Sequence, residues 1–209
     1  APETLNLMRA MVANGEVDHL VPERMWQEIS RGLMEAAPAR MFEVLRECGA
    51  LARIAPEIDA LFGVPERLDY HPEGDSGKHT LLVLDAAARL DLPLAARFAA
   101  LCHDLGKALT PADLLPRHIG HDKRGHEPIQ DLCERLRVPV DCRELALMAC
   151  REHILIHRSR ELRPDTLVDL FLRCDGFRRP ERFDLLLEVC RSDARGREGH
   201  AGADYPQAD

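Results

Sequence analysis

Prolines followed by apolar residues at helical spacing are the feature that most constrains how this chain can fold. Pro22, Pro38 and Pro56 each stand at the head of such a segment. Proline suits the first turn of a helix, because its ring fixes φ and no amide hydrogen is needed there. Behind Pro22, the side chains of Met25 and Ile29 recur on one helical face. The pattern predicts a succession of amphipathic helices.

The rest of the chain shows the same spacing and no alternating, strand-like segment. Helices are predicted over residues 78–90, 93–107, 128–136, 140–157, 165–174 and 180–195. Aromatic residues make up only 4% of the chain, so the core must consist mainly of Leu, Ala, Val and Ile. That composition favours helices over a β-sandwich. We therefore predict an all-α fold.

A polar, turn-rich stretch over residues 65–77 interrupts the helical pattern. Such stretches commonly separate domains. We predict a small helical segment over residues 1–66 and a second, larger domain over residues 67–209.

Charge, cysteine usage and hydropathy limit the partners and the compartment. The net charge of −8 is unusual for a free-standing nucleic-acid binder, so contact with RNA would need a local basic patch or a partner segment. The seven cysteines are scattered and form no C-x-x-C pair, which predicts reduced, buried thiols in a cytoplasmic protein. No apolar run has the length of a membrane span, so we expect no membrane partner.

The dipeptide His103-Asp104, followed by Leu-Gly-Lys, is the sharpest chemical feature. An imidazole and a carboxylate side by side reach one cation most easily where a helix ends, and we expect Gly106 to end this helix. This donor pair suits Mn, Fe, Ni, Co or Zn and, less strictly, Mg. A lone His-Asp dipeptide also arises by chance, and any one of these histidines can instead be a surface or hydrogen-bonded residue. Two further ligands are needed, and His79 and Asp175 are the candidates at the ends of neighbouring helices.

The order His79, His103-Asp104, Asp175 resembles the H…HD…D ligand pattern of the HD superfamily of metal-dependent phosphohydrolases. The resemblance implies that these four residues hold a divalent metal, with Ni or Mg expected first and Mn, Co or Zn as alternatives. It also implies catalytic roles for His103, Asp104 and Lys107. Lys107 would face substrate phosphate, although it can equally be a cation at a helix C-terminus.

A second cluster of polar residues follows the pair, in the loop that carries Arg117, His118 and His121. In many HD proteins, histidines in this region contact phosphate or a second metal, so we assign these three residues to substrate binding, with His121 preferred. His153 and His157 are four residues apart on one helical face. That spacing can hold a metal, but contact with substrate is the assignment we make for His153.

The resemblance becomes more specific over the whole chain. Residues 45–51 (LRECGAL), 56–65 (PEIDALFGVP), 97–107 (RFAALCHDLGK) and 193–197 (DARGR) are similar to segments of bacterial CCA-adding enzymes, in the same order. This implies a helical body or neck segment over 1–66 and an HD-domain helical bundle over 67–209. The nucleotidyltransferase head of that family carries a Gly-Ser motif and a D-x-D pair, and we find neither here. We therefore expect a C-terminal fragment that does not add CCA by itself.

The resemblance also implies activities and partners. It predicts 2′,3′-cyclic phosphodiesterase, 2′-nucleotidase and phosphatase activity on the tRNA 3′ end and on small 2′- or 2′,3′-cyclic nucleotides. A homodimer formed through the HD region is a further expectation. Two alternatives stay open: a tRNA-docking or dimerisation module with a structural HD site, and an HD nucleotidase unrelated to tRNA.

Overall fold

The computed structural model describes residues 2–208, and all regular elements in that range are helical. In chain order these are α1 (Pro2–Ala13), η1 (Glu16–His19), α2 (Pro22–Leu33), α3 (Ala39–Glu47), α4 (Leu51–Ile54), α5 (Pro56–Asp59), α6 (Ser76–Arg89), α7 (Leu94–Cys102), η2 (Leu105–Leu109), α8 (His121–Arg124), α9 (His126–Leu136), α10 (Val140–His157), η3 (Ser159–Glu161), α11 (Pro164–Arg173) and α12 (Pro180–Arg195). An isolated antiparallel bridge joins Pro65 and Asp75. The all-α prediction is confirmed. In the described range, no helix has both the length and the apolar character needed to cross a membrane.

Prolines stand at the helix starts, as the sequence predicts. Pro22, Pro56 and Pro180 open α2, α5 and α12. Pro164 opens α11 in the same way. Pro128 is the third residue of α9 rather than its first. It is tolerated there because the first-turn amides of a helix have no helical acceptor.

The predicted helix over residues 93–107 is divided in two. The α-helix ends at Cys102, because Asp104 adopts φ −108° and ψ 11°, outside the α-helical range, and a 3-10 helix begins at Leu105. Gly106 lies inside that 3-10 helix and is therefore not the residue that ends the α-helix. The break places His103 and Asp104 in a turn between the two helices.

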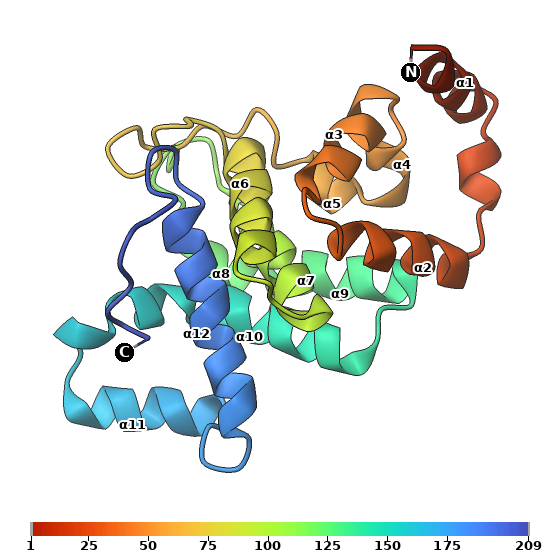
Figure 1. The fold of residues 1–209 in the computed structure, drawn as a ribbon. Coiled ribbons are helices and arrows are strands. Elements are labelled where there is room, and N and C mark those ends of the chain that lie inside the picture. The colour runs from red at the N-terminus through yellow and green to blue at the C-terminus, as the bar shows by residue number, and fades with distance from the viewer. Residues whose placement is uncertain (1, 209) are drawn as a thin grey trace.

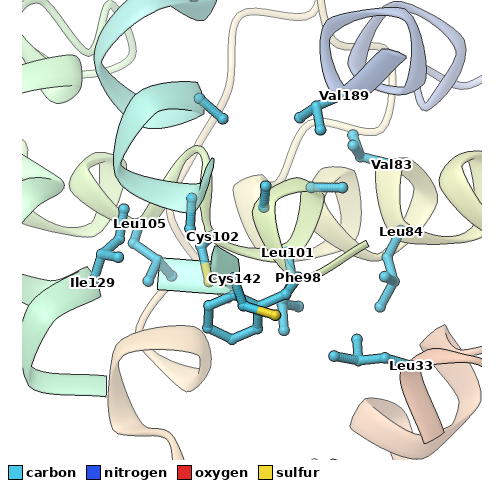
Figure 2. Close-up of a cluster of buried hydrophobic side chains, with 14 of the residues drawn as sticks. Leu33, Val83, Leu84, Phe98, Leu101, Cys102, Leu105, Ile129, Cys142 and Val189 are labelled. Atoms are coloured by element: carbon cyan, nitrogen blue, oxygen red, sulfur yellow. The ribbon is translucent and has the colours of Figure 1, made fainter. Parts of the chain in front are cut away.

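Helix α7 lies at the centre of the helical packing and contacts α6, α10 and α12 (Figure 1). Figure 2 shows Phe98 and Leu101 of α7 among Leu33, Leu84 and Val189, which come from α2, α6 and α12. These five side chains are at most 1% exposed. Burying each contributes about 1.5–3 kcal/mol. The helix that presents His103-Asp104 is thus held on several sides.

The N-terminal helices pack against the same core. The Trp26 ring on α2 meets Phe98 edge to face at 5.4 Å between centroids. The buried guanidinium of Arg97 donates to the carbonyl of Leu33, the last residue of α2, at 3.0 Å and to that of Glu35, just beyond the helix, at 2.9 Å. A single hydrophobic cluster therefore extends across residue 66, and the domain boundary placed there stays a prediction.

All seven cysteines are free and buried, as predicted for small apolar core residues. Burial raises the pKa of the Cys133 thiol to about 12, and the Cys142 and Cys150 thiols are shifted the same way. These thiols are therefore protonated at neutral pH and are packing residues rather than nucleophiles.

Candidate metal centre

His79 lies in the first turn of α6, and the start of that helix is fixed by Asp75. The Asp75 carboxylate caps the helix by accepting from the backbone amide of Lys78 at 2.9 Å. The His79 ring is fully buried. Its Nε2 lies 2.9 Å from Oδ1 of Asp193, and its Nδ1 lies 2.7 Å from Oε1 of Glu73. The ring is thus held between two carboxylates.

A first group of metal-ligating side chains consists of His79, His103 and Asp193, whose ligand atoms all lie within 4.8 Å of one another. The Nε2 atom of His103 lies 3.9 Å from Oδ2 of Asp193. The three residues come from α6, the turn after α7, and α12. Each is at most 5% exposed.

A second group, which satisfies the same 4.8 Å criterion, consists of Asp104, His121 and His153. Oδ1 of Asp104 lies 3.2 Å from Nε2 of His121 and 3.6 Å from Nε2 of His153. The two imidazole Nε2 atoms are 3.2 Å apart. Asp104 also joins the two groups, because its Oδ2 lies 3.2 Å from Nε2 of His103.

The backbone sets the tautomer of three of these histidines. Nδ1 of His103 donates to the carbonyl of Ala100 at 2.8 Å. Nδ1 of His121 donates to the carbonyl of His118 at 2.8 Å, and Nδ1 of His153 donates to that of Ala149 at 2.9 Å. In the neutral ring the Nε2 lone pair then faces the cluster. Histidines that bind a metal through one ring nitrogen usually donate the N–H of the other to a carbonyl or carboxylate in this way.

Two atoms where the groups meet have no hydrogen-bond partner. Nε2 of His103 and Oδ1 of Asp104 are buried and unsatisfied within the described part of the chain. Leaving a buried donor or acceptor unpaired costs about 1–3 kcal/mol. A cation between these atoms would satisfy both, so the residues present fit a divalent metal.

Burial alone would raise the pKa of both carboxyls, but nearby cations reverse this. His103 and Lys107 hold the pKa of Asp104 well below its usual range. His157 and His79 do the same for Asp193. Both carboxylates are therefore ionised at neutral pH and can serve as anionic ligands.

The histidines respond to the same environment in opposite ways. Burial lowers the pKa of His153 to about 3, which keeps that ring neutral and its Nε2 free to bind. Burial also disfavours the charged form of His103, but the Asp104 carboxylate outweighs it and raises the pKa of His103 to about 9. The positive charge beside Asp104 is therefore supplied either by a proton on His103 or by a bound cation.

Lys107 is buried against two carboxylates rather than standing free. Its Nζ donates to Oε1 of Glu66 at 2.7 Å and lies 2.8 Å from Oδ2 of Asp104. It also lines a hollow of about 260 Å³ together with His118, His121 and Arg117. Lys107 therefore touches the candidate metal ligands on one side and the hollow on the other.

The loop residues assigned to substrate binding occupy different positions around this hollow. Arg117 is exposed, whereas His118 is buried. The His118 ring is engaged at both nitrogens, with Thr110 Oγ1 at 2.8 Å and the Pro65 carbonyl at 3.0 Å. His121 contributes both to the lining and to the second metal-ligating group, whereas His153 lies only in that group.

The structure does not bring Asp175 to the cluster, so this part of the predicted ligand set needs correction. Asp175 follows α11 with φ 55°, and its half-exposed carboxylate lies 3.8 Å from Arg178 and from Arg179. It belongs to none of the metal-ligating groups found in residues 2–208. The carboxylate in that place is Asp193, which the sequence interpretation missed.

A helical-face signal for Asp193 is nevertheless present in the sequence. Leu186, Val189 and Cys190 form the buried face of α12, and residue 193 continues the same i, i+3, i+4, i+7 series. An aspartate on an otherwise apolar face is a buried polar residue that needs a partner. His157, which the sequence paired with His153 but left without an assigned role, is one such partner: its Nε2 donates to Oδ2 of Asp193 at 2.7 Å, while its Nδ1 meets the Tyr205 hydroxyl at 3.0 Å.

Comparison with known families finds two matches, one to the N-terminal helices and one to the part of the chain that carries the candidate metal centre. Residues 1–62 match the family described as "Probable RNA and SrmB- binding site of polymerase A". Residues 77–192 match the HD domain family. The second match covers more than half of the chain and contains the turn with His103-Asp104.

Curated relatives extend the similarity over the full length. The multifunctional CCA protein of Laribacter hongkongensis is 68% identical over 99% of this chain and 51% of the relative's length. Those of Ralstonia nicotianae and Paraburkholderia phymatum are 60% and 62% identical, over 48% and 50% of their lengths. The chain thus spans about half the length of the relatives it matches. The resemblance seen in the sequence is confirmed: the chain belongs to the HD domain family and corresponds to the portion of multifunctional CCA proteins that joins an RNA-binding region to an HD domain.

Proposed function

We propose that this chain is a metal-dependent phosphohydrolase that acts on phosphate esters of the tRNA 3′ end and on small 2′- or 2′,3′-cyclic nucleotides. The observation that carries the proposal is the pair of joined His/Asp groups around the unsatisfied atoms of His103 and Asp104. Borderline divalent ions such as Ni fit this mixed donor set, and Mg is the alternative that binds fewer nitrogen ligands. The similarity to multifunctional CCA proteins supports tRNA as the parent substrate.

The proposed ligands form two sites that share Asp104. His79, His103, Asp104 and Asp193 would hold one cation. Asp104, His121 and His153 are in position to hold a second. A bound divalent cation supplies Lewis acidity, which polarises a phosphoryl oxygen and makes water a stronger acid.

Other side chains orient these ligands and the substrate. The Glu73 carboxylate contacts Nδ1 of His79, and Nε2 of His157 donates to Oδ2 of Asp193. Lys107 fixes Asp104 and presents positive charge to the hollow. Arg117 at the rim can bind a phosphoryl oxygen. Hydrolysis forms a bond between water oxygen and phosphorus, breaks the ester bond, and transfers the water proton to the leaving oxygen.

The decisive experiment compares the two aspartates. Asp193→Asn should weaken Ni binding on the order of 100-fold, because even an outer partner of a metal ligand is worth about 10–100-fold. Asp175→Asn is the matched control and should stay within about twofold of wild type, since the Asp175 carboxylate lies beside the exposed Arg178 and Arg179 and away from the cluster. Calorimetric Ni titration gives the affinities, and rates on 2′,3′-cyclic AMP and 2′-AMP after chelation and reloading give the activity. Equal losses in both variants would reject the proposed ligand set.

A second candidate function rests on the match of residues 1–62 to a region described as a probable RNA-binding site. In this alternative the chain docks tRNA and the HD site is structural. Binding of tRNA without turnover of either nucleotide, in metal-loaded protein, would favour it. The homodimer expected from the sequence likewise stays a prediction, to be tested by light scattering of the purified chain.

A further inference from the structure

The hollow beside the candidate metal centre has a floor that belongs to the centre itself. Lys107 and His121 both line it, and both contact Asp104. Its one acidic lining residue, Glu66, is already engaged, accepting from Lys107 and from the Ser76 hydroxyl at 2.8 Å. A ligand in this hollow therefore lies next to the ligands of the proposed cation.

Two arginines that line the hollow have no anionic partner. Neither Arg117 nor Arg197 forms a side-chain hydrogen bond or an ion pair with any residue in the described range 2–208. Nε of Arg197 is buried and unsatisfied, although burying a guanidinium N–H without an acceptor is unfavourable. In a chain with a net charge of −8, two unpaired cations that line the same hollow mark a place for an anion.

The backbone around Arg197 is held on both sides. A Cβ at Gly196 would lie 2.6 Å from the Cα of Val83, so only glycine lets the chain pass this close to α6. On the other side, the amide of Glu198 donates to Oε2 of Glu73 at 3.3 Å. Glu73 also contacts His79, so the segment that carries Arg197 is anchored to the metal centre.

A partly exposed pair of arginine and tyrosine side chains also lines the hollow. The guanidinium of Arg67 lies over the ring of Tyr70, 4.8 Å from its centroid, and Asp69 pairs with Arg67. Tyr70 is 56% exposed, and both Arg67 and Tyr70 line the hollow. Aromatic rings and arginine planes are the surfaces on which unpaired bases stack.

We propose that this hollow is a nucleotide subsite, in which Arg197 and Arg117 bind the phosphate and the Arg67–Tyr70 stack receives the base. The inference deepens the proposed function, because it places a terminal nucleotide with its phosphate against the floor formed by Lys107 and His121. Arg197 and Tyr70 are binding residues in this scheme, and neither belongs to the proposed metal ligands.

The test uses two ligands: inorganic phosphate occupies only the phosphate end of the proposed subsite, whereas 2′-AMP also reaches the base end. Binding of inorganic phosphate and of 2′-AMP to the Ni-loaded chain is measured by calorimetry. Arg197→Ala should weaken both ligands by about 10-fold or more, because it removes charge-assisted hydrogen bonds. Tyr70→Ala should weaken 2′-AMP by about 10-fold and leave phosphate unchanged, since base stacking alone is lost. Arg24→Ala, an exposed arginine on α2 outside the hollow, is the matched control and should change neither.

The outcomes also separate this inference from the proposed hydrolase activity. Wild-type binding that Arg197→Ala abolishes, without turnover of any substrate, would support the subsite and reject the activity. Turnover by wild type, with both dissociation constants of Arg197→Ala within twofold of wild type, would overturn the subsite alone. Absence of phosphate binding to wild type would overturn it as well. If Arg197→Ala does not fold, Arg197→Lys and the exposed Arg117→Ala replace it, and unchanged affinity in both would count against the subsite.

Discussion

Gly106 is the residue whose replacement most directly tests how the two metal-ligating groups are held together. In the structure it lies where η2 meets α8. A Cβ added there would be 2.0 Å from the carbonyl oxygen of His121 and 2.5 Å from the amide nitrogen of Gly125. Both atoms are backbone, so no side-chain rotation relieves the clash. Gly106→Ala must therefore push α8 away from η2.

The size of the displacement follows from the contact distance. Ordinary contact for a Cβ begins at 3.4 Å, so the His121 carbonyl must withdraw by more than an ångström. The His121 ring, whose Nε2 lies 3.2 Å from both Asp104 Oδ1 and His153 Nε2, moves with it. A misplacement of about 1 Å can cost about 100-fold in rate, and overpacking destabilises by about 1–3 kcal/mol. The group of His79, His103 and Asp193 carries no residue from α8 and should keep its cation.

We therefore expect Gly106→Ala to lose one of two classes of bound Ni, to lose activity by about 100-fold, and to unfold at lower urea concentration. Metal stoichiometry by mass spectrometry, turnover of 2′,3′-cyclic AMP and urea unfolding measure the three effects. Gly32→Ala is the matched control, because the heavy atoms nearest to its Cβ all belong to the flexible Met41 side chain, with Sδ at 2.2 Å. Wild-type metal content and activity in Gly106→Ala, or an equal loss in Gly32→Ala, would refute the reasoning.

Three further predictions concern stability and reactivity. Arg97→Met should lower the free energy of unfolding by about 3 kcal/mol, because three carbonyls lose a charged donor. The exposed Arg31→Ala is the control and should change the free energy of unfolding by less than about 0.5 kcal/mol. Similar urea midpoints for the two variants would contradict the structural role given to Arg97. Lys107→Met should destabilise the metal-free chain by about 3–5 kcal/mol, because Glu66 and Asp104 are left as unpaired buried charges. Added Ni should recover part of this loss in a thermal melt, and a melt insensitive to Ni would count against a cation at Asp104. A thiol reagent should modify none of the seven buried cysteines in the folded chain and all seven in denaturant. Rapid labelling of the folded protein would show that the core packing described above is wrong.

Local sequence was enough to predict the helices and the central His-Asp pair. Proline at the first turn and apolar residues at helical spacing act within one segment, so they place α2, α5, α11 and α12 without knowledge of the fold. The dipeptide His103-Asp104 was likewise visible as a chemical feature at a helix end. Local pattern could not predict where that helix ends, because the end depends on the backbone conformation of Asp104 and not on Gly106. The missing side chain of Gly106 instead allows α8 to pack closely against η2.

The choice between Asp175 and Asp193 was decided only by tertiary structure. Both stand at or near the end of a helix, and a family-like order of residues favoured the first. Helix α12 packs on α6, α7 and α10, whereas α11 makes few contacts with the bundle and lies toward one end of the molecule (Figure 1). Asp193 continues the buried face of α12 and so meets His79, while Asp175 ends on the surface beside arginines. Sequence determined which residues can ligate a metal, and helix packing decided which of them meet, because ligands far apart in the chain converge only when their helices share a core.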